Sequence, residues 1–440
     1  MTIKPIYAGI CCLLLTAPAV AENWPQWRGQ RSDGVSNEKG IATHWSKSEN
    51  ILWSSPLPGQ GGATPAIWDD RIFLTSSVGN DNGADLVLIC CSTRDGRELW
   101  RQTVTGGNQN ARAGEGNSAS PSPSTDGKHV WVFFSTGVLA CYTVDGQMVW
   151  KFDVADRYGR IDIQFGLSST PVLHGDHLYL QLIHGAMRRD DNTRTGKVVK
   201  LDKLTGKEIW GVDRITNAQY ECKHSYASPF MVDDGQHRFL LVHGADCTTG
   251  HSLETGEELW RLSGLNGPSA YNTRNPDATF RFVASPGVAA GSIIIPTAKA
   301  GPTLVININD GLKGDITGNS SVVRWSTKTT PDVSIPLVVN GLVYNLHKDG
   351  KLQCLDLQTG EERYYMRTHG SVEHRTSPIY ADGHIYFCAK DGRCTVVKAG
   401  PDFKIVAAND FGEPITASPV VSNGVLYIRT YNNLYAIKNK

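Results

Sequence analysis

A ten-residue pattern that occurs five times constrains this chain more than any other feature of its sequence. Each copy places a glycine sixth and an aromatic residue tenth. The copies are "CSTRDGRELW" (91–100), "CYTVDGQMVW" (141–150), "LDKLTGKEIW" (201–210), "HSLETGEELW" (251–260) and "LDLQTGEERY" (355–364). Recurrence of one short unit at intervals of a few tens of residues is typical of solenoids and propellers, in which each unit buries its faces against its neighbours.

A second repeated element lies between the decamers. It begins with a small residue, then Ser or Thr, then Pro. Alternating apolar residues and an Asx or Gly turn follow. Eight copies occur, with their prolines at 65, 121, 171, 229, 286, 336, 378 and 419. The alternation and the turn predict a β-hairpin in each copy. A third strand and the aromatic decamer follow, so each unit holds four short antiparallel strands. The chain is therefore predicted to be an all-β, eight-bladed β-propeller.

The eighth unit lacks its fourth strand, because the chain ends at Lys440 directly after the last hairpin. The segment "NILWSSPL" (50–57) precedes the first hairpin and resembles an isolated fourth strand, with Trp53 in the aromatic position. We expect this N-terminal strand to complete the last blade and to close the ring, which leaves no open sheet edge between the ends of the chain.

The aromatic positions are predicted to dock one blade against the next. The turn glycine supplies a backbone conformation with φ > 0, and the aromatic four residues later reaches the boundary with the neighbouring blade. The seventh hairpin's unit offers Ile405 in place of an aromatic. The predicted docking residues are Trp53, Trp100, Trp150, Trp210, Trp260, Trp325 and Tyr364.

The first 21 residues have the pattern of a secretory signal peptide. Lys4 precedes the apolar stretch "IYAGICCLLL", and Ala19-Val20-Ala21 predicts cleavage after Ala21. We expect residues 22–45 to form an N-terminal extension and residues 46–440 to form the propeller. The mature protein is expected to be a periplasmic or secreted monomer with no transmembrane segment. Its 43 basic and 43 acidic residues argue against a nucleic-acid partner.

The decamers, the Ser-Pro hairpins and the aromatic positions together resemble the pyrroloquinoline-quinone-like (PQQ-like) propeller repeat family over residues 46–440. The opening "NWPQWRGQRSDGVS" looks like the lead-in of exported members of unassigned activity. The family includes quinoprotein alcohol dehydrogenases, a lipoprotein of the outer-membrane β-barrel assembly machine and sensor domains. The resemblance therefore implies the fold but no single function.

The mouth of the central channel is the predicted functional site. In a propeller, the loop that leads into each innermost strand lies at this mouth, and polar residues of several blades meet there. Lys223 lies in one of these loops beside His224. The candidate ligand-binding residues are Glu115, Asn117, Gln164, His224, Tyr226, Arg281, Asp332, His374, Arg375 and Glu413. The alternative is that these residues only pair with one another and contact solvent at the channel mouth, and bind no ligand.

A quinoprotein dehydrogenase site is the alternative that the resemblance implies. Enzymes of the family hold calcium with carboxylate and amide oxygens, use an aspartate base, and place the quinone between a tryptophan and a vicinal disulfide. Cys90-Cys91 looks like that pair but lies in a predicted strand, where adjacent side chains point to opposite faces. PQQ and calcium are therefore not supported by the site residues, no metal site is expected, and Asp332 is the weak candidate for a base.

The cysteines carry the last structural expectation. Export permits disulfides, and Cys222 and Cys247 are expected at the same end of one hairpin, which makes them the predicted bond. A two-residue turn at Asp391-Gly392 would place Cys388 and Cys394 on opposite faces, so these two are expected to stay unbridged.

The function predicted from the sequence is that of an exported scaffold that binds a protein partner or a small polar ligand, carbohydrates included. A dehydrogenase with an atypical site is the alternative.

Overall fold

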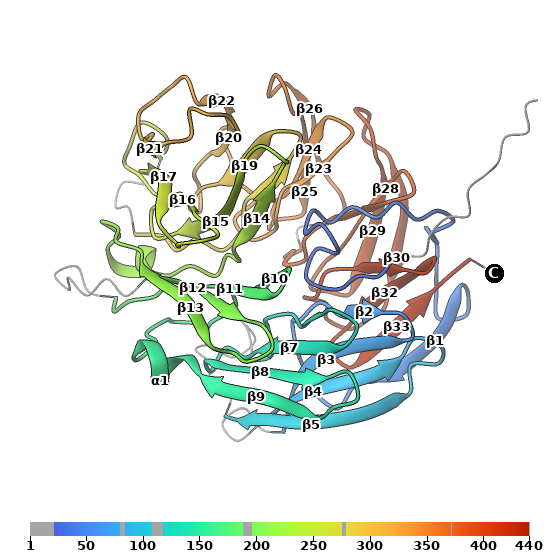
Figure 1. Cartoon of the computed structure of the whole chain (residues 1–440). Helices are drawn as coiled ribbons and strands as arrows, with labels where there is room; N and C mark the ends of the chain where they lie inside the picture. Colours follow the sequence, from blue (N-terminus) through green and yellow to red (C-terminus); the bar gives the residue numbers. More distant parts are fainter. Residues whose placement is uncertain are drawn as a thin grey trace, which may run out of the picture.

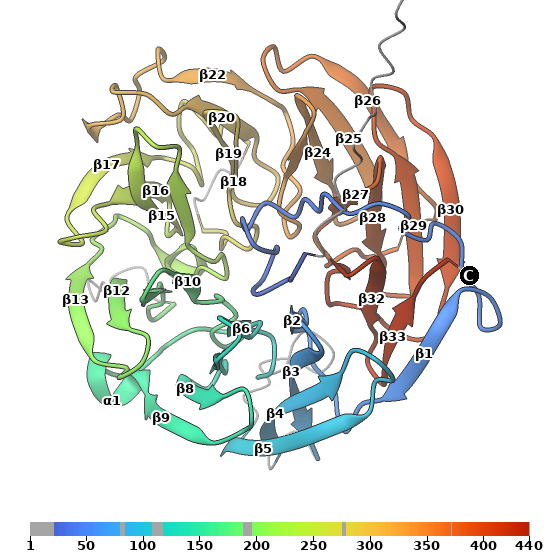
Figure 2. The same ribbon diagram turned by 45° about the vertical axis from the view of Figure 1, so that its right-hand side comes forward.

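The computed structural model describes residues 22–79, 84–107, 118–187, 196–274, 279–370 and 372–439. Within these ranges the chain forms eight β-sheets that stand as blades around a central axis (Figure 1; Figure 2). The described residues contain one short α-helix, α1 (Val154–Tyr158), and one 3₁₀ helix, η1 (Tyr220–Lys223). None of them forms a helix long and apolar enough to cross a membrane. The predicted eight-bladed all-β propeller is confirmed.

The blades are numbered here from the first complete one, and each is given from its inner to its outer strand. Blade 1 contains β2 (Ala66–Trp68), β3 (Arg71–Val78), β4 (Asp85–Ser92) and β5 (Glu98–Gly106). Blade 2 contains β6 (Ser124–Thr125), β7 (His129–Phe133), β8 (Val138–Thr143) and β9 (Met148–Asp153). Blade 3 contains β10 (Val172–His174), β11 (His177–Leu182), β12 (Lys197–Asp202) and β13 (Glu208–Asp213). Blade 4 contains β14 (Phe230–Asp233), β15 (Arg238–Gly244), β16 (Cys247–His251) and β17 (Glu258–Ser263).

The remaining blades follow the same order. Blade 5 contains β18 (Gly287–Ala289), β19 (Ser292–Pro296), β20 (Thr303–Asn307) and β22 (Val323–Ser326). Blade 6 contains β23 (Leu337–Val339), β24 (Leu342–Leu346), β25 (Lys351–Asp356) and β26 (Glu362–Arg367). Blade 7 contains β27 (Ile379–Ala381), β28 (His384–Cys388), β29 (Arg393–Lys398) and β30 (Ile405–Asp410). Blade 8 contains β31 (Val420–Ser422), β32 (Val425–Arg429), β33 (Asn433–Ile437) and β1 (Ile51–Pro56).

The ring closes as predicted, because β1 is the outer strand of the last blade. It pairs antiparallel with β33, with Trp53 opposite Ala436 and Pro56 opposite Asn433. Figure 2 shows the blue β1 beside the red β33. Strand pairing between the two ends of the chain satisfies the backbone groups that an open last blade would leave exposed.

A hydrogen bond between neighbouring blades explains why Ser or Thr precedes seven of the eight repeat prolines. The buried hydroxyl of this Ser or Thr accepts a hydrogen bond from the backbone N–H of the equivalent residue in the preceding blade. Seven such bonds of 2.8–3.3 Å join Thr64 to Ser122, Ser122 to Thr170, Thr170 to Ser228, Ser228 to Ser285, Ile335 to Ser377, Ser377 to Ser418 and Ser418 to Thr64. We call this set the hydroxyl belt. It shows that the repeat proline of blade 2 is Pro123, not Pro121 as the sequence pattern predicted.

Five tryptophans lie against the turn glycine of the next blade. Each indole Nε1 donates to a carbonyl of that blade at 2.9–3.2 Å. The turn glycines have φ between 64° and 86°, and a Cβ on any of them would stand 2.5–2.9 Å from an indole atom. Glycine is thus required both for the turn conformation and for space. The pairs are Trp53 with Gly96, Trp100 with Gly146, Trp150 with Gly206, Trp210 with Gly256 and Trp325 with Gly360.

The other two predicted docking residues have different surroundings. Trp260 is followed by a blade whose third and fourth strands are joined by a long insertion instead of a tight turn. This insertion places β21 (Gly314–Asp315) beside β17 in parallel, with Gly314 opposite Trp260. The Trp260 ring packs edge-on against Phe239, with 5.7 Å between centroids. The ring of Tyr364 packs against that of Phe403 in blade 7, with 5.2 Å between the ring centroids.

The N-terminal extension covers one end of the central channel. Residues 23–36 bond to residues at the far ends of the inner strands: Asn23 to Asp69, Pro25 to Thr125, Gln26 to Leu173 and Ser36 to Tyr380. Gln26, Trp27 and Arg28 also border a small cavity with the inner-strand starts of blades 3 to 6. In Figure 2 this dark blue segment lies across the middle of the ring. We call it the plug, and its end of the channel the plugged end.

The disulfide predictions were wrong. Cys388 and Cys394 are bonded, with their Cα atoms 4.0 Å apart. Ala389 N bonds to Arg393 O and Gly392 N to Ala389 O, so three residues instead of two lie between the paired Ala389 and Arg393. The extra residue shifts the register by one and places Cys388 directly opposite Cys394.

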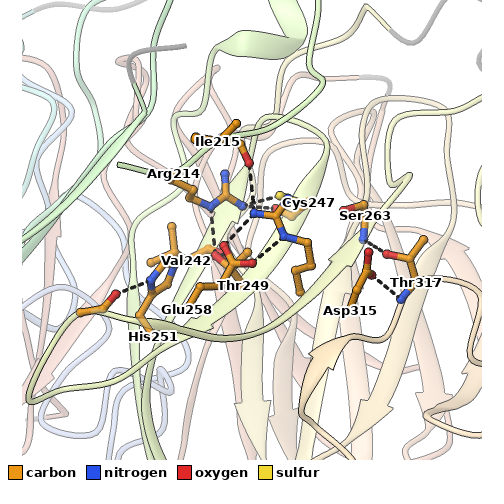
Figure 3. A network of polar contacts seen from close by, with 12 residues as sticks. Arg214, Ile215, Val242, Cys247, Thr249, His251, Glu258, Ser263, Asp315 and Thr317 are labelled. Carbon is orange, nitrogen blue, oxygen red and sulfur yellow. Dashed lines mark hydrogen bonds and ion pairs between the residues drawn. The ribbon is translucent and has the colours of Figure 1, made fainter. Parts of the chain in front are cut away.

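Cys222 and Cys247 remain separate buried thiols, contrary to the predicted bond. The fully buried guanidinium of Arg214 occupies the space around Cys247: it donates to its Sγ at 2.9 Å and its carbonyl at 2.7 Å (Figure 3). The same guanidinium donates to Thr249 Oγ1 at 3.0 Å and Gly244 O at 2.7 Å. These four bonds satisfy a buried charge that would otherwise be costly.

Candidate functional site

The channel end opposite the plug carries two cavities, and we call this end the mouth. The first, the Asp332 cavity, has a volume of about 550 Å³ and includes Thr330, Asp332, Tyr365 and Glu373 in its wall. The second, the Arg281 cavity, has a volume of about 710 Å³ and includes Gln164, Phe165, Glu221 and Arg281. Both walls contain Lys299 and Lys348. The two cavities therefore adjoin at these lysines and extend from blade 3 to blade 7.

Asp332 lies in the loop that leads into β23, half-buried and with φ = 67°. A non-glycine residue in this conformation is uncommon and is found more often at functional sites. No described residue forms a hydrogen bond or ion pair with its carboxylate. Burial raises the pKa of Asp332 above its ordinary value, although the charges of Arg281, Lys348, Lys299 and Arg375 act in the opposite direction. Asp332 is thus a half-buried acceptor on which the charges of four cations act.

Glu373 joins three cations at the same mouth. Its carboxylate lies 2.9 Å from Lys348, 3.1 Å from Arg375 and 3.4 Å from Lys390. Burial alone would raise the pKa of Glu373, but the hydrogen bond from Lys348 and the charge of Arg375 outweigh it and lower the pKa to about 2. Glu373 therefore stays ionised and holds Lys348 in place between the two cavities.

The Arg281 cavity is organised by a second ion pair. Arg281 Nη1 lies 3.2 Å from Glu221 Oε1, and its guanidinium carbon is 5.5 Å from the centre of the Phe165 ring. Lys299 is exposed, and its Nζ is 5.7 Å from the centre of the Phe280 ring. Among the described residues Lys299 has no acidic partner. Lys299 therefore enters no ion pair among the described residues, although its charge acts on Asp332.

The structure brings Gln164, Arg281, Asp332 and Arg375 to the mouth but assigns three other predicted residues to the interior. His224 is buried, with Nε2 2.8 Å from Gly185 O, and burial lowers its pKa. Tyr226 Oη accepts from Phe165 N at 3.3 Å. His374 donates from Nδ1 to Val372 O at 2.9 Å, and burial lowers its pKa to about 4. Each of these side chains supports a loop of the mouth from below.

The remaining candidates do not join the two cavities. Glu413 accepts from Asn432 N, Asn433 Nδ2 and Tyr435 Oη, all within its own blade. Lys223 is buried at the end of η1. Glu115 and Asn117 lie outside the described residues.

Sequence reasoning missed Lys299 and Lys348, which connect the two cavities. It considered only the loops that lead into the inner strands, whereas both lysines lie in loops between the second and third strands of their blades. Antiparallel order places these loops at the same end of the blade as the lead-in loops. The strand pattern therefore contained the signal that would have found both residues.

The residues described at the mouth do not fit the quinone and calcium arrangement that the resemblance implies. Cys90 and Cys91 are separate thiols on opposite faces of β4, where each packs into a different hydrophobic cluster. The described walls of the two cavities include no tryptophan. The described part of the chain also contains no group of three His, Cys, Asp or Glu side chains placed to hold a metal ion. We therefore derive no chemistry through PQQ or calcium.

The blade repeat, the ring closure and the mouth together define a PQQ-like β-propeller. The family described as "Outer membrane protein assembly factor BamB" matches residues 38–270, 145–393 and 249–440, and the chain belongs to this family. The outer membrane protein assembly factor BamB of Yersinia pestis is 24% identical over 316 residues, which is 70% of each chain.

Two solved structures show the same fold at low sequence identity. BamB from Moraxella catarrhalis superposes with a TM-score of 0.63 at 13% identity, covering 88% of this chain and 99% of that one. The quinohemoprotein alcohol dehydrogenase ADHIIG from Pseudomonas putida HK5 superposes with a TM-score of 0.61 at 14% identity, covering 94% and 80%. A protein named as an assembly factor and an alcohol dehydrogenase thus share this architecture, so the fold alone does not choose between functions.

Proposed function

We propose that this protein is an exported scaffold that binds another protein, and that the mouth of the channel is its binding face. One observation carries the proposal: the two ends of the ring differ. The plug covers one end with the chain's own residues 23–36. The other end is hollowed over five blades and displays charges, of which Lys299 has no acidic partner among the described residues.

Family membership supports a role in protein assembly. The matching family and the relative from Yersinia pestis are both named as outer membrane protein assembly factors. We carry over from that name only the general role, which is to hold another protein during assembly. A small polar ligand in the same cavities is the competing reading.

The proposed location is the periplasm or the cell surface. Residues 1–21 have the charged start, apolar stretch and small-residue end of a signal peptide, and cleavage after Ala21 would place Glu22 first. Glu22 directly precedes the plug, and its backbone N–H donates to Glu38 Oε1 at 2.8 Å.

Site-specific photocrosslinking in cells tests this proposal. A photoreactive amino acid replaces Lys299 at the mouth in one strain and Lys39, which is exposed at the plugged end, in a second strain. We expect a discrete protein adduct from position 299 that mass spectrometry identifies, and none of comparable yield from position 39. Equal adducts from both positions, or none from position 299, would overturn the proposal.

A further inference from the structure

We propose that the mouth receives an extended acidic segment of the partner polypeptide, with Lys299 and Lys348 binding its carboxylates and Asp332 accepting from its backbone N–H. This inference rests on the proposed function and names the chemistry of the partner at the same site. It follows from three properties of the described mouth residues: the unpaired Lys299, the arrangement of the two cavities and the unpartnered Asp332.

The charge of the mouth favours an acidic occupant. The carboxylates other than Asp332 are already engaged: Glu221 with Arg281, Glu373 with Lys348, and Asp349 with Lys351 at 3.2 Å. Lys299 stands apart from these pairs. Lys299 is exposed and forms no ion pair with a described residue, so a negatively charged group that enters the mouth can pair with it without displacing a carboxylate of the chain.

The arrangement of the cavities favours an extended occupant. Two cavities of about 550 and 710 Å³ lie side by side and share Lys299 and Lys348. Cavities for small ligands are usually single and mainly apolar in lining. An extended partner segment could occupy both cavities at once. It would then run past Lys299 and Lys348, which lie where the cavities adjoin. Their ammonium groups are then placed to pair with successive acidic side chains.

Aromatic rings lie beside three cations at or near the two cavities. Arg281 lies over Phe165 at 5.5 Å, Lys299 over Phe280 at 5.7 Å and Lys351 over Tyr365 at 5.2 Å. A cation held over a ring face loses part of its conformational freedom before binding. The entropy lost when it pairs with a carboxylate is therefore smaller.

Asp332 distinguishes a polypeptide from other polyanions. Its carboxylate is half-buried and has no donor among the described residues. A polyphosphate brings only acceptors and would be repelled by this group. A peptide brings backbone N–H donors along with its acidic side chains, so one segment satisfies both the lysines and Asp332.

Fluorescence anisotropy with the mature protein tests the inference. The probe is a short labelled peptide with glutamate at alternate positions, and a peptide with glutamine at those positions is its control. Tripolyphosphate is the competing anion. We expect saturable binding of the glutamate peptide, no comparable binding of the glutamine peptide, and only weak competition by tripolyphosphate. Tripolyphosphate binding as tight as that of the peptide would assign the mouth to small anions and reject the inference.

Two double variants locate the binding. Lys299→Ala with Lys348→Ala is expected to weaken peptide binding about tenfold, the equivalent of one charge-assisted hydrogen bond. Lys207→Ala with Lys404→Ala removes two exposed lysines from turns at the plugged end and is expected to leave the Kd unchanged. Equal losses in the two variants would show that binding follows net charge and would reject the site. Thermal melting checks that both variants fold.

Asp332→Asn changes the affinity for the glutamate peptide in opposite directions, depending on whether Asp332 accepts a hydrogen bond or the mouth only attracts negative charge. If Asp332 accepts from a peptide N–H, the neutral amide weakens peptide binding. If the mouth attracts anions by charge alone, removal of a negative charge strengthens it, and the role of Asp332 is rejected. The proposed function fails separately: a photocrosslink from position 299 without glutamate-peptide binding leaves the scaffold standing and rejects only the acidic segment.

Discussion

The backbone N–H of Ser418 donates to the hydroxyl of Thr64 at 3.3 Å, which joins two residues that are 354 positions apart in the chain. This bond links blade 8 to blade 1 through the hydroxyl belt, and β1 completes blade 8 by pairing with β33. The two closures act at different radii, one at the inner strand and one at the outer strand. The belt lacks one link, because Ile335 has no hydroxyl to accept from Ser285.

Ser228→Ala tests the hydroxyl belt. The substitution removes the acceptor of Thr170 N, now 2.8 Å away, and leaves a buried N–H without its partner. We expect a loss of ~1–3 kcal/mol in the free energy of unfolding, measured by urea denaturation. Ser48→Ala, at an exposed position, is the control and should change stability by less than ~0.5 kcal/mol. If Ser228→Ala were as stable as Ser48→Ala, the hydroxyl belt would not stabilise the fold.

Trp210→Ala tests the docking of one blade on the next. The indole contacts Gly256 and donates to Leu253 O at 3.2 Å. Removal of this buried ring is expected to cost ~3–5 kcal/mol. Trp210→Phe keeps a ring but loses the hydrogen bond, and should cost less, by a margin of at least ~1 kcal/mol. Equal unfolding midpoints for the two variants would contradict the packing role.

Deletion of residues 50–57 removes β1 and exposes the edge of β33. An unpaired strand at this edge is a template for pairing with another molecule. We expect aggregates or dimers in size-exclusion chromatography with light scattering, whereas we expect the full chain to elute as a monomer. A soluble monomer with unchanged thermal stability would show that β1 is not needed for closure.

The ion cluster at Glu373 predicts a pH dependence of defined sign. The pKa of Glu373 is lowered from 4.5 to about 2. A lowered folded-state pKa contributes stability above the unfolded value of 4.5, and this contribution is lost as the pH falls towards 2. The difference in unfolding free energy between wild type and Glu373→Gln should therefore be constant from neutral pH to about 4.5 and shrink below it. A difference that does not change over this interval would contradict the ion cluster.

Much of the fold was predictable because each blade repeats its own local chemistry. The turn glycines and the aromatics four residues later specify hairpins and outer strands within a single unit. "NILWSSPL" matched this pattern although it lies at the opposite end of the chain from the blade it completes. Trp260 departed from the pattern because the following insertion replaces the tight turn with β21, and no local rule predicts how an insertion folds.

The candidate site was predictable only in part. Arg281 and Asp332 reach the mouth because the lead-in loops of a propeller meet there. His224 and His374 lie in equivalent loops, but their side chains are buried in the interior. Their burial depends on packing against neighbouring segments, which the local sequence does not reveal. Lys299 and Lys348 were missed because only the lead-in loops were considered, although the loops between the second and third strands lie at the same end of each blade.

The sequence by itself determined the number of blades, the strand order and the closure of the ring, because these follow from short-range periodicity and turn chemistry repeated along the chain. Only the tertiary structure decided which cysteines meet and which charges stay unpaired. One residue in the loop after Cys388 shifts the register and creates the bond to Cys394. Arg214 reaches Cys247 from a different blade and occupies the place of the expected disulfide. Such contacts depend on distances between segments that are far apart in the chain, and these distances are set only when the ring is assembled.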